Sequence, residues 1–162
     1  MALSEVPFRV ALVEGTRDTL LARFWTRYLQ SVVDVVNNSA RKLTLKSLTA
    51  QGAAISTTTL DTGTLDPGVY RVSYTARITR AASTSSSLTV TISWRDGDVA
   101  QSQSGVAMTG NSTTTQQNGT FLVHNGTNAS AANDVIKYAT AYASSGGTTM
   151  QYSLYVLVEQ VG

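Results

Sequence analysis

The sequence contains no cysteine and a single histidine, His124, among its 162 residues. Without cysteine there is neither a disulfide nor a thiolate metal site, and one histidine falls short of the ligand set that a zinc ion requires. We therefore expect no metal and no other cofactor. No run of apolar residues approaches the length needed to cross a bilayer, so we expect no membrane insertion.

Charge is also scarce. Charged residues make up 14% of the chain and the net charge is +2, which predicts no binding to nucleic acid. Residues 1–46 carry seven basic and four acidic side chains, a net of +3, which suits either an acidic partner or a solvated helix face. The stretch "MALSEVPFRVALVEGTRD" has no signal-peptide pattern, so we expect the protein to be made and assembled in the cytoplasm.

Catalytic patterns are missing as well. No serine near His124 is marked as a nucleophile, and no phosphate-binding loop or dinucleotide motif occurs. The carboxylates that follow residue 43 fall mostly in turn patterns, and "RDGD" (95–98) predicts a hairpin turn rather than a calcium loop. We therefore expect no catalytic residues and no enzyme activity.

The sequence predicts one helix, close to its N-terminus. We predict an extended arm over 1–16, with a short strand at "FRVALV", and an amphipathic helix over 17–40. One apolar stripe of this helix has successive residues 4, 3, 4 and 3 positions apart, which is the a/d spacing of two packed helices: Leu21, Trp25, Tyr28, Val32 and Val35. The residues expected to form an oligomer or anchor interface are Leu21, Phe24, Trp25, Tyr28, Leu29, Val32 and Val35.

From residue 43 the apolar period changes to two, which predicts a β domain over 43–162. "VYRVSYTARITR", "SLTVTISWR" and the last strand each alternate apolar and polar residues, and further strands are expected near 99–107, 113–123 and 134–143. The fold class is mainly β: an antiparallel β-sandwich, jelly-roll-like with about eight strands, preceded by one helix. Periodicity alone does not separate this topology from an immunoglobulin-like one.

The same alternation sorts the aromatic and basic residues of the β domain. Tyr70, Tyr74 and Trp94 are in phase with aliphatic core positions, whereas Tyr155 is out of phase and is a candidate for surface contact. Arg71 and Arg77 lie on the wet side of one strand, where they would form either a polar contact between subunits or an ordinary solvated face.

The helix has three possible fates: it packs on its own sheet, it associates with copies of itself, or it docks on another protein. Two heptads are marginal alone. We expect a symmetric homo-oligomer, a trimer first of all, supported by the β domains, with docking on another protein as the runner-up.

Three stretches carry a resemblance to a known group of proteins. "GVYRVSYTARITRAASTSSSLTVTISWRDGDVAQSQSGVAMTGNSTTTQQNGTFLVH" and "YATAYASSGGTTMQYSLYVLVEQV" resemble a β-domain of tailed-bacteriophage structural proteins, and "FWTRYLQSV" resembles a helix preceding phage fibre heads. The resemblance covers roughly residues 20–160. It implies location in the virion, homotrimers, and either host-surface binding or capsid decoration, and it supplies no residue-level site.

Four functions follow as expectations. The first is a tail-fibre, head-fibre or spike subunit attached to a capsid, portal or tail protein through residues 1–40, with the sandwich facing outward. The second is a capsid decoration protein that stabilises the shell. The third is a carbohydrate-binding module for a host-surface glycan, and the fourth, least favoured because acids are few, is a hydrolase of such glycans.

Overall fold

The computed structural model describes residues 16–37 and 41–161, with side chains for 23–33 and 43–161. The chain divides into two compact units, Met1–Ser39 and Ala40–Gly162. Residues 1–15 of the expected arm, with the expected strand at "FRVALV", lie outside the described residues. No helix of the described part is long and apolar enough to span a membrane.

The first unit contains the helix α1, Thr16–Asn37, which confirms the expectation of one helix ahead of the β domain. It runs for 22 residues and ends within the "NNSA" stretch that carries the stop signal. The side chains of Leu21 and Val35 lie outside the described residues, so their place in the expected interface stays a prediction.

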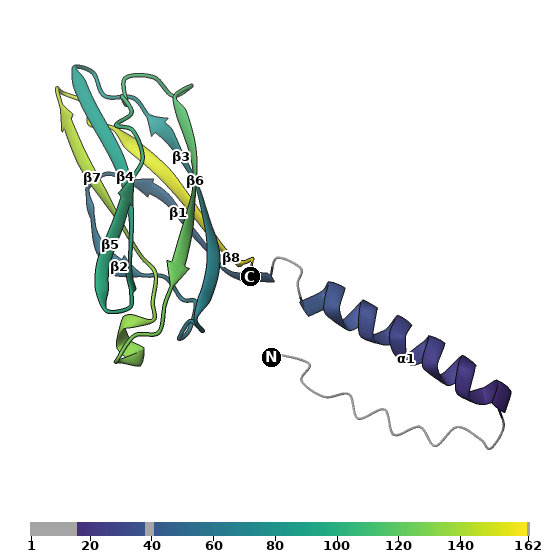
Figure 1. Ribbon diagram of the computed structural model, residues 1–162. Helices are drawn as coiled ribbons and strands as arrows, with labels where there is room; N and C mark the ends of the chain where they lie inside the picture. The colour runs from purple at the N-terminus through teal and green to yellow at the C-terminus, as the bar shows by residue number, and fades with distance from the viewer. Residues whose placement is uncertain (1–15, 38–40, 162) are drawn as a thin grey trace. The chain divides into compact units, whose positions relative to one another are not determined.

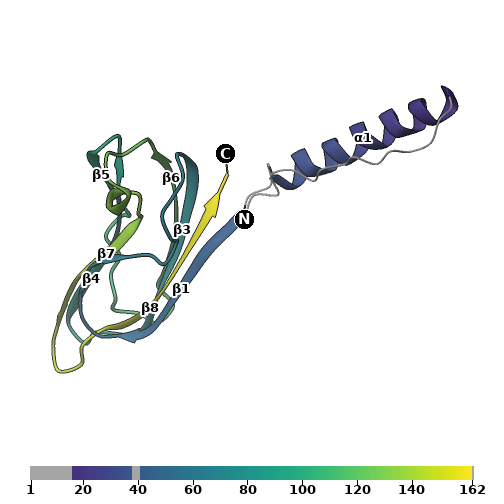
Figure 2. The same cartoon turned by 90° about the horizontal axis from the view of Figure 1, so that it is seen from below.

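The second unit is a sandwich of two four-stranded antiparallel sheets (Figures 1 and 2). One sheet has the strand order β1-β8-β3-β6 and the other β2-β7-β4-β5. The expected eight-stranded jelly roll is confirmed, because this interleaved order is that of two Greek keys folded into one sandwich. The strands are β1 Arg41–Gln51, β2 Ile55–Thr59, β3 Gly68–Arg80, β4 Ser85–Asp96, β5 Val99–Ser104, β6 Gln116–Asn125, β7 Lys137–Ser145 and β8 Gln151–Gln160.

Alternation along the strands builds the core. In β3, β4 and β8 alternate side chains are buried between the sheets, and those between them face outward or lie half-buried, except for Ser153 of β8, which is also buried. Tyr70 and Tyr74 are buried as expected, and Trp94 is partly buried against the same core. The Nε1 atom of Trp94 has no hydrogen-bond partner among the described residues.

Two elements depart from simple alternation. The expected phase of β1 changes at Leu48, but Leu43 and Leu48 both pack against the core while Leu45 is 51% exposed. The register shift between Lys42 and Thr44 accounts for the change of face between Leu43 and Leu45. The other is β2, "ISTTT", which has too few apolar residues to be recognised as a strand from the sequence.

The turn between β4 and β5 has the geometry that its sequence predicts. Gly97 and Asp98 both have positive φ, 54° and 65°, which matches the hairpin turn that follows the twist of two antiparallel strands. Arg41 pairs with Gln160, so the start of β1 lies beside the end of β8. Both lie at the end of the sandwich that carries the turn between β4 and β5.

A chain of hydrogen bonds closes the crossover from β1 to β2. The backbone N–H of Ile55 donates to Oγ1 of Thr140 (2.8 Å), the hydroxyls of Thr140 and Tyr152 lie 2.7 Å apart, and Tyr152 donates to the carbonyl of Ala53 (2.9 Å). Thr140 and Tyr152 are buried. Burial raises the pKa of Tyr152 above its ordinary value of 10.0, with Thr140 opposing the shift.

Candidate functional surfaces

The described part of α1 presents an aromatic cluster, defined here as Phe24, Trp25 and Tyr28. The rings of Phe24 and Trp25 lie 6.1 Å apart and those of Trp25 and Tyr28 5.8 Å apart, both edge to face. The three side chains are 64%, 53% and 53% exposed, and Val32, one turn further on, is 41% exposed. Leu29 is half-buried. Aromatic surface of this extent is costly to leave in water, so the cluster is suited to a partner.

The outer face of the β1-β8-β3-β6 sheet holds all three surface residues expected from the sequence. Arg71 pairs with Glu159 across β3 and β8, with Nη2 2.8 Å from the carboxylate. Tyr155 is 40% exposed and lies opposite Thr75, and Arg77 is exposed two residues further along β3. The structure therefore brings Arg71, Arg77 and Tyr155 onto one surface, while their role in contact stays a prediction.

The same outer face carries apolar residues that the sequence did not single out. Leu122 on β6 is 66% exposed, and Leu45 on β1 lies opposite the half-buried Leu157 of β8. These leucines are far apart along the chain. They would have been recognised as one surface only from the pairing of β1 with β8 and of β6 with β3.

The polar loops at one end of the sandwich are occupied by their own hydrogen bonds. Nδ1 of His124 lies 2.9 Å from Oδ1 of Asp96, which also accepts from the N–H of Gly126. The carboxylate of Asp98 accepts from the N–H of Ala129 and from Nδ2 of Asn133. Within the described residues no hydroxyl is hydrogen-bonded to His124, and no group of three or more acidic or histidine side chains is arranged to hold a metal.

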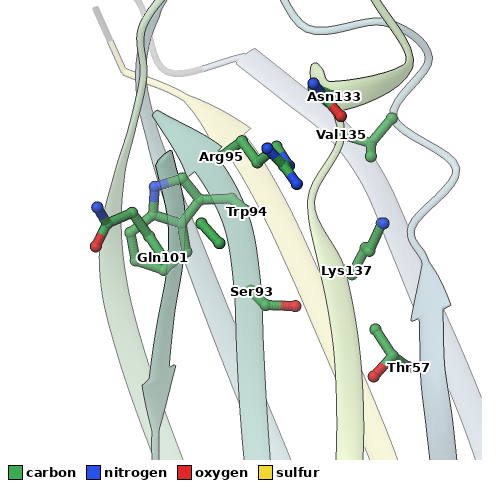
Figure 3. A pocket seen from close by; sticks show the side chains of 9 residues that line it. Thr57, Ser93, Trp94, Arg95, Gln101, Asn133, Val135 and Lys137 are labelled. Atoms are coloured by element: carbon green, nitrogen blue, oxygen red, sulfur yellow. The ribbon is translucent and has the colours of Figure 1, made fainter. Parts of the chain in front are cut away.

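A solvent-open pocket lies on the outer face of the other sheet, β2-β7-β4-β5. Its volume is about 230 Å³. Figure 3 shows the side chains of Arg95, Asn133 and Lys137 gathered around one space between β4 and the segment that leads into β7, with Ser93 and Thr57 below. We call five polar lining side chains on this face the basic pocket: Thr57, Ser93, Arg95, Asn133 and Lys137. The other polar lining residue, Gln101, pairs with Trp94 and shares its side of the sheet.

The basic pocket was not predicted from the sequence, because its residues come from three strands, β2, β4 and β7, and from the short 3-10 helix Ala131–Asn133. Ser93 and Lys137 are partners in the register of β4 and β7, and Lys137 also pairs with Thr59 of β2. The available signal was parity: Ser93 and Arg95 flank the inward-facing position of Trp94, so both belong on the outer face.

Comparisons with known proteins place the chain in no family. No protein-family model and no curated protein matches it. Among solved structures, PRD1 vertex protein P5 is similar at 16% identity and a TM-score of 0.44, over 73% of this chain and 73% of that one. A likeness at this identity and TM-score supports no functional assignment.

Proposed function

We propose that this chain is a non-enzymatic structural protein of a bacteriophage virion. In this proposal α1 holds copies of the chain together as a homotrimer, the N-terminal region attaches the assembly to a capsid, portal or tail protein, and the jelly roll faces outward for contact with the host surface. Assembly takes place in the host cytoplasm, and the finished protein resides in the virion.

The observation that carries the proposal is the exposed aromatic cluster on α1. An isolated helix of this length is marginal in water, so its stability has to come from burying an apolar face. Fully burying one large apolar side chain contributes about 1.5–3 kcal/mol, and three aromatic rings with Val32 supply several such contributions per chain. Trp25, Tyr28 and Val32 lie at positions i, i+3 and i+7, the spacing that a helix bundle buries.

Other observations support the location in a virion and the number of copies in the oligomer. The stretches quoted from the β domain and from α1 resemble tailed-phage structural proteins, and that resemblance implies homotrimers in a virion. The Ser- and Thr-rich strands favour the same reading, because such a surface stays hydrated with little charge.

Light scattering behind size exclusion tests the oligomer. We expect the full chain to have the mass of a trimer and Trp25→Glu to fall to the mass of a monomer. Gln30→Glu is the matched control: it adds the same charge about 140° away around the helix from Trp25, and it should leave the trimer intact. A monomeric full chain would overturn the trimer.

A second measurement separates self-association from docking. If a chain truncated to begin at Leu43 remains a trimer, the sandwich holds the copies and α1 is the anchor, as in a decoration protein. The virion itself is tested by mass spectrometry of density-purified particles from the phage that encodes the chain. Particles that lack the chain would refute the virion assignment whatever the oligomer is.

A further inference from the structure

The basic pocket contains two cations, Arg95 and Lys137, beside hydroxyl, amide and apolar lining residues. Ser93 pairs directly with Lys137, and Arg95 follows two residues after Ser93 on the same face of β4. Side chains diagonal to each other across two strands lie within reach of long residues, so a single small anion can contact both Arg95 and Lys137.

Neither cation is neutralised by a neighbour. The ion pairs of the described residues are Lys46–Asp61, Arg71–Glu159 and His124–Asp96, so Arg95 and Lys137 form none. Arg95 donates through Nη1 to the backbone carbonyl of Asp98 (2.7 Å), which orients the guanidinium and leaves its other N–H groups without a described partner. The Asp98 carboxylate bonds instead to Ala129 and Asn133.

The groups around the cations suit a polyhydroxylated ligand. Ser93 and Thr57 offer hydroxyls. Asn133 uses its Nδ2 on Asp98, so its Oδ1 is available to accept from a ligand hydroxyl. Trp94, Ala100 and Val135 supply the apolar part of the lining. A volume of about 230 Å³ is below that of drug-sized pockets.

The geometry points to the basic pocket as a binding site for an acidic sugar residue, a hexuronate or a sialate. Its carboxylate would lie on Arg95 and Lys137, and its ring hydroxyls would contact Ser93, Thr57 and Asn133. The inference deepens the proposed function, because it rests on an outward-facing sandwich and names the chemistry of the host surface: an anionic polysaccharide.

Amide chemical-shift mapping on the full chain tests the site. Galacturonate and N-acetylneuraminate are titrated as probes, with galactose as the neutral sugar, inorganic phosphate as the bare anion and a short Asp/Glu peptide as the acidic protein segment. We expect at least one acidic sugar to shift residues of β4 and β7 around the pocket, and to bind more tightly than galactose, phosphate and peptide.

Variants then assign the contacts. Arg95→Gln and Lys137→Gln should each weaken binding by about tenfold, the effect of losing one charge-assisted hydrogen bond. Arg77→Gln, which removes an exposed cation from the other sheet, should leave binding unchanged. Unaltered oligomer mass and unfolding midpoint in each variant show that the fold is retained.

Several outcomes would overturn the inference: equal binding of galactose, equal binding of phosphate, tighter binding of the peptide, shifts centred on Tyr155 and Arg77, or no shifts at all. These outcomes leave the proposed function standing if the full chain is a trimer found in particles. Conversely, acidic-sugar binding by a monomer absent from particles would support the site while refuting the virion role.

Discussion

Replacing Tyr152 by phenylalanine should destabilise the sandwich by about 1–3 kcal/mol. The ring stays in place, so no cavity forms, and the change removes only the hydroxyl. That hydroxyl donates to the carbonyl of Ala53 and lies 2.7 Å from the hydroxyl of Thr140. Thr140 is 4% exposed, so its own hydroxyl is left buried without an acceptor. The magnitude is that of one unsatisfied buried group, since the carbonyl of Ala53, an exposed residue, can turn to water.

A double-mutant cycle isolates the bond. Thr140→Val removes the acceptor of the Ile55 N–H and should cost a similar amount, while the double variant should cost less than the sum because both single changes break one shared interaction. The assay is urea unfolding of the full chain at one fixed protein concentration, because an oligomer's stability depends on concentration. Ser73→Ala, which removes an exposed hydroxyl contact to Thr120, is the control.

The reasoning is refuted if Tyr152→Phe costs no more than Ser73→Ala. Strict additivity of the two changes would also contradict it, since the hydroxyls of Thr140 and Tyr152 would then not share an interaction. If the slope of the unfolding free energy against urea concentration changes while the midpoint concentration does not, the substitution acts on the denatured state instead.

Three further predictions test other parts of the sandwich. Burial raises the pKa of the Tyr152 hydroxyl above its ordinary 10.0. Its contribution to the free energy of unfolding is therefore complete below pH 10.0 and is lost as the pH rises through the folded-state pKa. Urea unfolding at increasing alkaline pH should show this loss of stability, and Tyr152→Phe should show a smaller loss. Gly119→Ala should destabilise by about 1–3 kcal/mol in urea, since the added Cβ would meet the ring of Tyr74. Asn125→Ala should cost about 1–3 kcal/mol, because the buried amide holds the carbonyl of Asp66, whereas Asn118→Ala on the exposed face should cost less than 1 kcal/mol in the same assay.

The strands that the sequence predicts best are those buried on one face. In β3 and β8 the apolar residues alternate along most of the strand, so the sequence assigns Tyr70, Tyr74 and Tyr155 to the correct faces. The pattern failed where pairing rather than burial makes the strand. β2 has one half-buried residue, Ile55, and exists because its backbone bonds to β7. The interleaved order of the sheets is also a property of pairing across the chain, which local periodicity does not contain.

The surfaces divide in the same way. Parity predicts that Arg71, Arg77 and Tyr155 point outward, but only the adjacency of β3 and β8 places them on one face. The basic pocket was harder to predict, because the sequence places Arg95 in a turn and Lys137 inside a separate strand, and only the pairing of β4 with β7 brings them together. The aromatic cluster of α1 was accessible because its residues are neighbours along one helix.

The pairing of Arg41 with Gln160 has a practical consequence for engineering. The polypeptide enters and completes the sandwich at the same end, so the turn between β7 and β8 lies at the opposite end, away from both points. Gly147 in that turn has no atom within 4 Å of where a Cβ would stand. A foreign loop inserted in this turn would lie far from the start of β1 and the end of β8, so it would distort neither of them. The sandwich is therefore suited to display peptide epitopes.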